Sequence, residues 1–200
     1  MRSRRAIGRD LLASDPIEVA PLLIGKLVVH AGREGRIVEV EAYRGELDPA
    51  SHAYRGPTVR NATMFGRAGL LYVYFSYGMH WCANVVCGPE GVAGAVLLRA
   101  LEPVRGLDAM ASARAGRRRA GTPPPVRDLC RGPANLTTAL GITKDHDGAD
   151  LLSPSSPVRL VDDGTEPPAG PALARGPRVG ISRATEVEWR FWLSGSRFVS

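Results

Sequence analysis

The feature that most constrains the fold of this chain is a pair of apolar, β-branched runs separated by a short glycine-bounded segment. The runs cover residues 26–30 and 36–43, and Gly32-Arg33-Glu34-Gly35 lies between them. This pattern predicts two antiparallel strands joined as a hairpin. In the second run Glu39 and Glu41 share one face of the predicted strand, because side chains alternate along a strand.

These two carboxylates are the first candidates for chemistry. Glu41 lies between Val40 and Ala42, on a strand that the pattern places in the sheet centre. A carboxylate in such a place is costly to bury unless it is paired or used. Two interpretations remain open: Glu41 and Glu39 pair with some of the many arginines, or one of them is catalytic.

A second strand pair is predicted over residues 70–74 and 81–86, joined by a short connection that turns at Gly78. A fifth strand covers residues 95–101 and ends toward Pro103, since proline cannot donate to a sheet ladder. The other predicted segments are helices over 16–24, 107–120 and from 132 to about 136, a loop over 121–125, and surface loops over 152–171 with a strand at 158–161.

The connection between the second pair of strands is rich in aromatic residues. The run from Tyr72 to Tyr77 concentrates them in a chain that is only 6% aromatic. Aromatic side chains at a strand-turn tip suit base stacking or insertion into a duplex. Sheet packing is the alternative for Tyr72, whereas Tyr77, beside the turn glycine, is hard to bury.

Composition favours one domain, over residues 1–200, with an anionic partner. Two hundred residues with 44% hydrophobic side chains are enough for one core and short for two. The formal net charge of +6 comes almost wholly from arginine, because Lys26 and Lys144 are the only lysines. Such an excess is typical of nucleic-acid binding, although an arginine-rich proteome gives the same balance. Four arginines near the end of the helix over 107–120 either contact phosphates or form a solvated face: Arg114, Arg117, Arg118 and Arg119.

The cysteines indicate a reducing compartment. Three of them, with no close pair, argue against a disulfide framework. No apolar run is long enough to span a bilayer, so we expect a cytoplasmic protein with neither signal peptide nor membrane helix. A zinc site is an alternative use, but the spacing fits none of the usual structural patterns for its candidate ligands His80, Cys82, Cys87 and Cys130. The signatures of zinc deaminases, P-loops and dinucleotide sites are absent, which predicts chemistry without metal or cofactor.

Several blocks of the chain, in order and at compatible spacing, resemble the alkyladenine (3-methyladenine) DNA glycosylase family of bacterial type. The blocks are Arg36–Tyr43, Arg60–Phe65, Leu71–Met79, Leu97–Pro103, Leu129–Leu136, Gly176–Ile181 and Arg190–Trp192. The resemblance runs from about residue 9 to residue 200. It implies one α+β domain, a curved antiparallel β-sheet flanked by helices, with a protruding β-hairpin that enters the minor groove.

The resemblance also implies an activity: a monofunctional DNA glycosylase of base excision repair, acting on double-stranded DNA. It would flip alkylated or deaminated purines, of the 3-methyladenine, 7-methylguanine and hypoxanthine class, and hydrolyse the N-glycosidic bond with an activated water. We expect no lyase activity, because a Schiff base needs an amine and neither lysine lies in a site motif. The family further implies a monomer, here at the bacterial nucleoid.

The family assigns each candidate residue a role. Glu41 would activate the water, and Arg99 would approach the nucleotide beside it. The residues expected to contact the base and the duplex are Tyr43, His52 and Tyr74 as pocket aromatics, Asn84 at the pocket floor against the exocyclic amine of guanine, Tyr77 as the intercalating wedge, and Met79 next to it. His80 stands where family members carry an aromatic residue, so the hairpin contacts with DNA are expected to differ there.

Two rival functions fit parts of this pattern. A non-catalytic DNA-damage binding protein of the same fold would keep the wedge and lose hydrolysis, and the presence of Glu41 argues against it. A basic RNA-binding module is suggested only by charge and aromatic residues.

Overall fold

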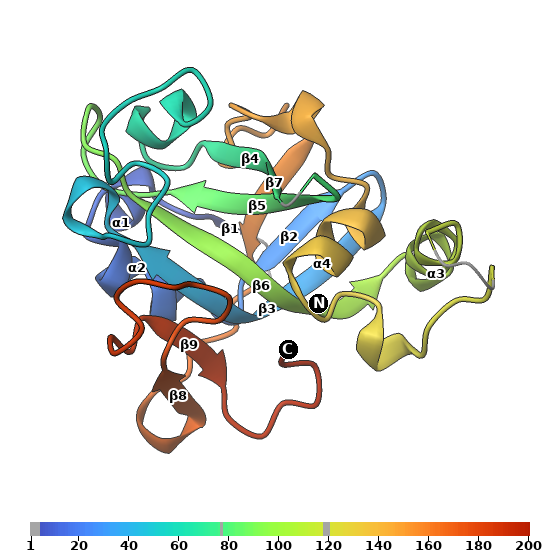
Figure 1. The fold of residues 1–200 in the computed structure, drawn as a ribbon. Helices are drawn as coiled ribbons and strands as arrows, with labels where there is room; N and C mark the ends of the chain where they lie inside the picture. Colours follow the sequence, from blue (N-terminus) through green and yellow to red (C-terminus); the bar gives the residue numbers. More distant parts are fainter. Residues whose placement is uncertain (1–4, 77, 118–120) are drawn as a thin grey trace.

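The computed structural model describes residues 5–76, 78–117 and 121–200, which form one antiparallel sheet with helices packed against it (Figure 1). The strands within these residues are β1 (Arg5–Ala6), β2 (Leu27–His30), β3 (Arg33–Tyr43), β4 (Leu71–Ser76), β5 (His80–Val86), β6 (Ala95–Arg105), β7 (Val158–Asp162), β8 (Leu173–Gly176) and β9 (Arg190–Leu193). The α-helices are α1 (Arg9–Leu12), α2 (Pro16–Leu23), α3 (Leu107–Ala115) and α4 (Pro133–Leu140). The predicted α+β class is confirmed.

Strand β3 lies in the middle of the sheet, whose strand order is β1-β7-β2-β3-β6-β5-β4. One edge of β3 pairs along its length with β6. The other edge pairs first with β2, over Arg33–Arg36, and then with β9, over Glu39–Glu41. The strand that carries both candidate carboxylates is therefore covered on each edge, and Glu39 and Glu41 are fully buried.

The first hairpin turns earlier than the sequence predicts. The turn is the two-residue pair Ala31-Gly32, with φ of 46° and 75°, and Arg33 already pairs with His30. Positive φ at both central residues gives the type I′ turn, whose twist matches that of antiparallel strands. Gly35 is a strand residue rather than a turn residue, since it pairs with Val28 and Pro103. The position needs glycine because a Cβ there would lie 2.8 Å from the Leu101 side chain.

Strand β6 also runs further than predicted, through Pro103 to Arg105. The register steps from Gly35 opposite Pro103 to Glu34 opposite Arg105, so Val104 is an extra residue in the ladder. Proline is tolerated in strands at such bulges, because the donor that it lacks is not needed there.

The predicted start of α2 is confirmed, with Asp15 Oδ1 accepting from the Ile17 N–H at 2.9 Å. Helix α4 begins as predicted and continues to Leu140. The helix predicted over 107–120 ends at Ala115 instead, and residues 118–120 lie outside the described residues. Strand β7 confirms the prediction at 158–161, whereas β1, α1, β8 and β9 were not predicted.

Two apolar clusters position the site. The larger one joins α2, α4 and the sheet, and it includes Phe191 of β9. The smaller one gathers around Tyr72, which is 1% exposed, together with Met64 and Ala53. This second cluster forms the base of a cavity.

Candidate active site

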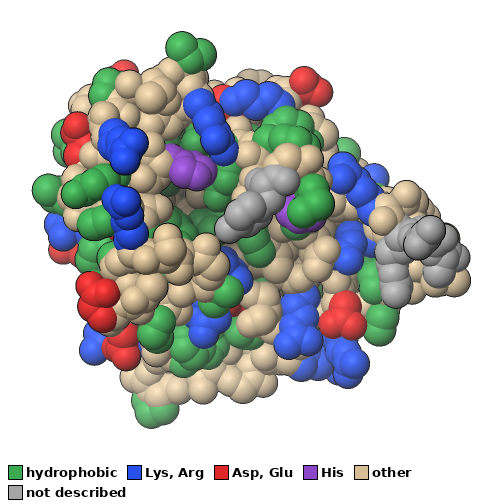
Figure 2. All heavy atoms as spheres, viewed as in Figure 1, with side chains coloured by type: hydrophobic (Ala, Val, Ile, Leu, Met, Phe, Trp, Pro, Cys, Tyr) green, Lys and Arg blue, Asp and Glu red, His purple; other side chains and the backbone are tan. Residues whose placement is uncertain are grey.

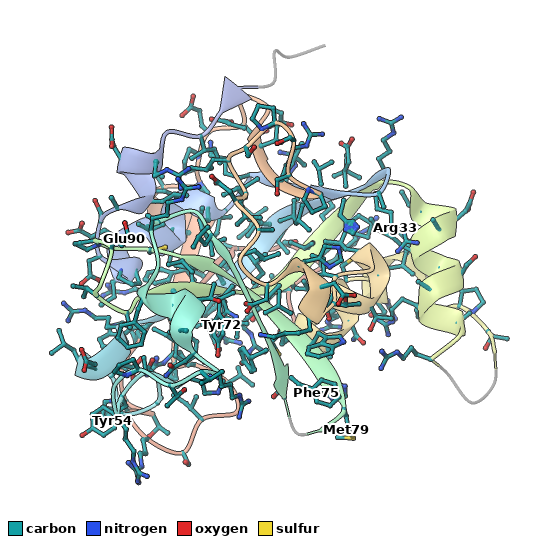
Figure 3. All side chains as sticks on the ribbon, turned by 90° about the horizontal axis from the view of Figure 1, so that it is seen from above. Arg33, Tyr54, Tyr72, Phe75, Met79 and Glu90 are labelled. Carbon is teal, nitrogen blue, oxygen red and sulfur yellow. The ribbon has the colours of Figure 1, made fainter. Side chains whose placement is uncertain are left out.

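A cavity of about 500 Å³ lies where β4, β5 and β6 meet the segments around residues 49–52 and 179–183. The sequence-predicted residues that line it are Tyr43, His52, Tyr74, Asn84 and Arg99. Figure 2 shows a hollowed face of the molecule, with Lys and Arg side chains gathered around the hollow. In Figure 3, Tyr54 and the hairpin residue Met79 project to the same side, away from Tyr72.

One wall of the cavity is aromatic. The rings of His52 and Tyr74 meet edge-on with centroids 4.3 Å apart, and His52 Nδ1 lies 3.3 Å from the Tyr72 hydroxyl. Partial burial, and then the nearby Arg60 guanidinium, lower the pKa of His52, which favours a neutral ring near pH 7. Burial raises the pKa of Tyr74 and raises that of Tyr72 to about 12. The wall is uncharged and offers π faces to a planar ligand.

The orientation of Asn84 on this floor is fixed. It is 4% exposed on β5, and its Nδ2 donates to the carbonyl oxygen of Tyr72 at 3.1 Å, across the β4–β5 pair. Arg60, at the rim, lies 5.9 Å from the Tyr74 ring and donates to the carbonyl of Phe75. The loop that carries Arg60 is thereby tied to the hairpin.

Glu41 lies directly behind the cavity lining and is fully buried. Its Oε1 accepts from the Val179 N–H at 2.7 Å and lies 3.2 Å from Arg99 Nη1, while its Oε2 accepts from the Tyr43 hydroxyl at 2.9 Å. All three partners line the cavity. Both interpretations from the sequence therefore meet in this residue, since Glu41 is paired with an arginine and also adjoins the cavity.

Arg99 reaches both carboxylates because of a pair of compensating bulges. The β3–β6 register skips Val38 on β3 and then Arg99 on β6, between Glu39 opposite Ala100 and Val40 opposite Leu98. A bulge re-aims the side chain of its extra residue. Arg99 thus donates through Nε to Glu39 Oε1 at 3.0 Å and places Nη1 beside Glu41.

The segment around Val179 was missed by sequence reasoning. Arg178 and Asp48, both fully buried, form a bidentate ion pair, and Arg178 also donates to the Ala42 carbonyl. The guanidinium lies 4.6 Å from the Tyr43 ring. These contacts fix Val179 against Glu41. The block Gly176–Ile181 resembled the family, but no property of its side chains indicated a role for a backbone N–H.

The hairpin tip is described only in part. Met79 is 58% exposed, His80 opens β5 opposite Ser76, and Tyr77 lies outside the described residues. Arg117 donates to the Met79 carbonyl at 3.4 Å, which ties the end of α3 to the hairpin.

Arg114 is half-buried, and part of its guanidinium is engaged within the protein. Its Nη1 donates to the Leu129 carbonyl at 2.7 Å and to that of Asp128. Arg118 and Arg119 lie outside the described residues.

The cysteines do not form a cluster. Cys82 lines the cavity, whereas Cys87 and Cys130 lie in the larger core, and all three are free thiols. In the described part of the chain, no group of three or more histidine, cysteine or acidic residues is arranged to hold a metal ion. Nor does any helix there have the length and apolar character needed to cross a membrane.

Comparison with known proteins decides the family. The model of the methylpurine-DNA glycosylase family matches residues 10–197. The chain belongs to this family. Relatives named "Putative 3-methyladenine DNA glycosylase" occur in Burkholderia lata, 55% identical over 96% of this chain and 87% of the relative, and in Leifsonia xyli, 52% identical over 96% and 91%. A relative of the same name in Nocardia farcinica is 49% identical over 94% and 88%.

Membership in the methylpurine-DNA glycosylase family confirms the resemblance seen in the sequence blocks. The protein is a DNA repair glycosylase, a hydrolase of N-glycosyl bonds whose substrate is DNA.

Proposed function

We propose that the protein releases alkylated or deaminated purines from double-stranded DNA by hydrolysis, with Glu41 as the group that activates water. The observation that carries this proposal is the position of Glu41, a buried carboxylate whose two hydrogen-bond donors and one ion-pair partner all line one cavity. The name that the relatives carry points to 3-methyladenine as one substrate, and we extend the class to 7-methylguanine and hypoxanthine.

The cavity suits a flipped purine. An enzyme that acts on a base must extrude it from the stack, and the extruded ring is read by stacking and by hydrogen bonds. Tyr43, His52 and Tyr74 supply aromatic faces, and Asn84 supplies an amide whose orientation the Tyr72 carbonyl fixes. We assign Asn84 to exclusion of the exocyclic amine of normal guanine.

For an alkylated purine, the chemistry needs one carboxylate. Cleavage of an N-glycosidic bond passes through an oxocarbenium-like sugar, which a nearby carboxylate stabilises while it takes a proton from the attacking water. A purine alkylated at N3 or N7 already carries positive charge and leaves readily. Arg99 Nη1, 3.2 Å from Glu41 Oε1, orients the carboxylate toward the cavity.

We propose a monofunctional enzyme, acting as a monomer at the bacterial nucleoid. A lyase step requires an amine nucleophile, and both lysines are engaged elsewhere. Lys26 pairs with Asp162 at 3.0 Å, and Lys144 pairs with Asp147 at 2.8 Å. Neither lysine lines the cavity.

The test is release of free base from alkylated and hypoxanthine-containing duplexes. We expect Glu41→Gln to reduce release to background, because the amide cannot take a proton from water, and to retain binding to duplex with an abasic-site analogue. Full activity of Glu41→Gln would exclude Glu41 as the base. A wild type that binds damaged duplex but releases no base would instead support the non-catalytic damage-binding alternative.

A further inference from the structure

Glu39 is a buried carboxylate that the mechanism above does not use. It is fully buried on β3, two residues before Glu41, and does not line the cavity. Its Oε1 accepts from Arg99 Nε at 3.0 Å and from Arg190 Nη1 at 3.3 Å, and its Oε2 accepts from the backbone N–H of Ser200 at 2.6 Å. Both oxygens are bound by donors, which is the condition under which a buried carboxylate stays charged.

Glu39 and Ser200 together hold the side of Arg99 that faces away from Glu41. Arg99 Nε donates to Glu39, and Arg99 Nη2 donates to Ser200 Oγ at 3.1 Å. The remaining nitrogen, Nη1, lies 3.2 Å from Glu41 Oε1. Because a guanidinium is planar and rigid, fixing two of its nitrogens fixes the third.

The segment that carries Ser200 is itself anchored. Phe198 is 7% exposed and packs in a cluster with Val38 and Ala100, beside the two bulges of the β3–β6 ladder. The Val199 carbonyl accepts from Arg131 Nε at 2.8 Å. The backbone N–H of Ser200 is thereby held in place against Glu39.

The charges of this group balance. Glu39 and Glu41 face Arg99 and Arg190, which gives two negative and two positive groups in a buried setting. Without the charge of Glu39, Arg99 would have Glu41 as its one ionic partner. The guanidinium would then be drawn onto the carboxylate oxygens that the attacking water needs.

We propose that Glu39 is a positioning residue for the glycosylase reaction. Together with Ser200 it holds Arg99 so that the guanidinium meets Glu41 at Oε1 and leaves Oε2 for the attacking water. This role rests on the proposed function of Glu41.

The experiment compares Glu39→Gln with the wild type in single-turnover release of hypoxanthine from duplex DNA across pH. We expect the maximal rate to fall on the order of 10- to 100-fold, as when a reacting group is slightly displaced. Binding to duplex with an abasic-site analogue should change less than about threefold, since Glu39 does not reach the cavity. The acid limb of the rate profile should move to lower pH, because loss of a neighbouring negative charge favours ionised Glu41.

Asp163→Asn is the matched control, since it breaks a partly buried pair with Arg36, at 2.7 Å, that does not contact the cavity. Ser200→Ala is a second variant at an exposed residue. It removes the acceptor of Arg99 Nη2, and we expect release to slow by about fivefold, the effect of one hydrogen bond. If Glu39→Gln does not fold, Ser200→Ala tests whether the positioning of Arg99 affects the rate.

Each outcome has a separate meaning. The positioning role is overturned if Glu39→Gln and Ser200→Ala release base as fast as Asp163→Asn and the acid limb does not move. That result would not affect the assignment of Glu41 as the base. A wild type that releases no base overturns the proposed function, and the role of Glu39 with it. Slower release with an unmoved acid limb would mark Glu39 as merely structural and would also overturn the proposal.

Discussion

At the scale of single residues, the site depends on charged groups that contact no solvent. Arg178 and Asp48 are both fully buried, and their ion pair holds Val179 against Glu41. Asp48 Oδ atoms also accept from the backbone N–H groups of Arg44 and Ala50. A charge buried in this way is stable only while its partner keeps the opposite charge.

We therefore expect Asp48→Asn to lower the free energy of unfolding by about 3–5 kcal/mol, because it leaves the Arg178 guanidinium buried without a counter-charge. The measurement is urea denaturation followed by circular dichroism. Glu188→Gln is the control, since Glu188 pairs with Arg175 at the surface, where ion pairs contribute at most about 1 kcal/mol. Equal losses of unfolding free energy in the two variants would show that the buried ion pair stabilises the protein no more than the surface pair.

At the scale of elements, the β4–β5 hairpin connects the cavity to an exposed segment near its turn. Tyr72 and Tyr74 on β4 and Asn84 on β5 contribute to the cavity, while Met79, near the turn, is exposed. The same two strands therefore line the cavity and carry an exposed segment next to the turn. Arg60 and Arg117 bind carbonyls of this tip from two other segments, which limits its movement relative to the pocket.

The wedge assignment of Tyr77 stays a prediction, since this residue lies outside the described residues. We expect Tyr77→Ala to weaken binding to damaged duplex by roughly 5- to 150-fold, the equivalent of losing one base stack of about 1–3 kcal/mol. The measurement is a dissociation constant for duplex with an abasic-site analogue, together with a melting temperature. Val92→Ala, an exposed apolar residue that does not line the cavity, is the control. An unchanged dissociation constant for Tyr77→Ala would refute the wedge.

At the scale of the whole molecule, the balance of charge and burial predicts how stability varies with pH. His30, at the end of β2, has its ring 4.5 Å from that of His146. Burial, and then the charges of His146 and Arg33, lower the pKa of His30 from 6.5 to about 4. The unfolded chain therefore takes up a proton near pH 6.5, whereas the folded chain does not until about pH 4.

Stability is expected to fall as pH decreases from 6.5 to about 4, because protons bind the unfolded state in that window. The ion pair with Arg36 lowers the pKa of Asp163, so a further loss begins below 3.8, where that carboxylate protonates first in the unfolded chain. We expect His30→Leu to flatten the slope between pH 6.5 and 4 and to leave the loss below 3.8 intact. Urea midpoints measured across pH report the stability loss in both pH windows. Identical slopes of stability against pH in variant and wild type would contradict the role of His30.

What the sequence determined by itself is local in character. Alternation in residues 36–43 predicts a strand, and Asp15-Pro16 predicts where α2 begins, because both depend on neighbours a few residues apart. The ordered sequence blocks also predicted the family, which is confirmed, and they named three aromatic residues that line one cavity, whereas the role of Glu41 stays a prediction. The sequence placed the first turn at residues 32–35 instead of Ala31-Gly32. Glycine at both Gly32 and Gly35 makes either position suitable for a turn.

Only the tertiary structure decided the environment of Glu41. Val179 and Ser200 lie 138 and 161 residues from the carboxylates that they bind, and Arg99 reaches both carboxylates through compensating bulges. No local pattern encodes such contacts, because they depend on strand register and on loops closed over long separations. The sequence identified the carboxylate that could act, and packing of β6, β9 and residues 178–200 around β3 determined how it is held.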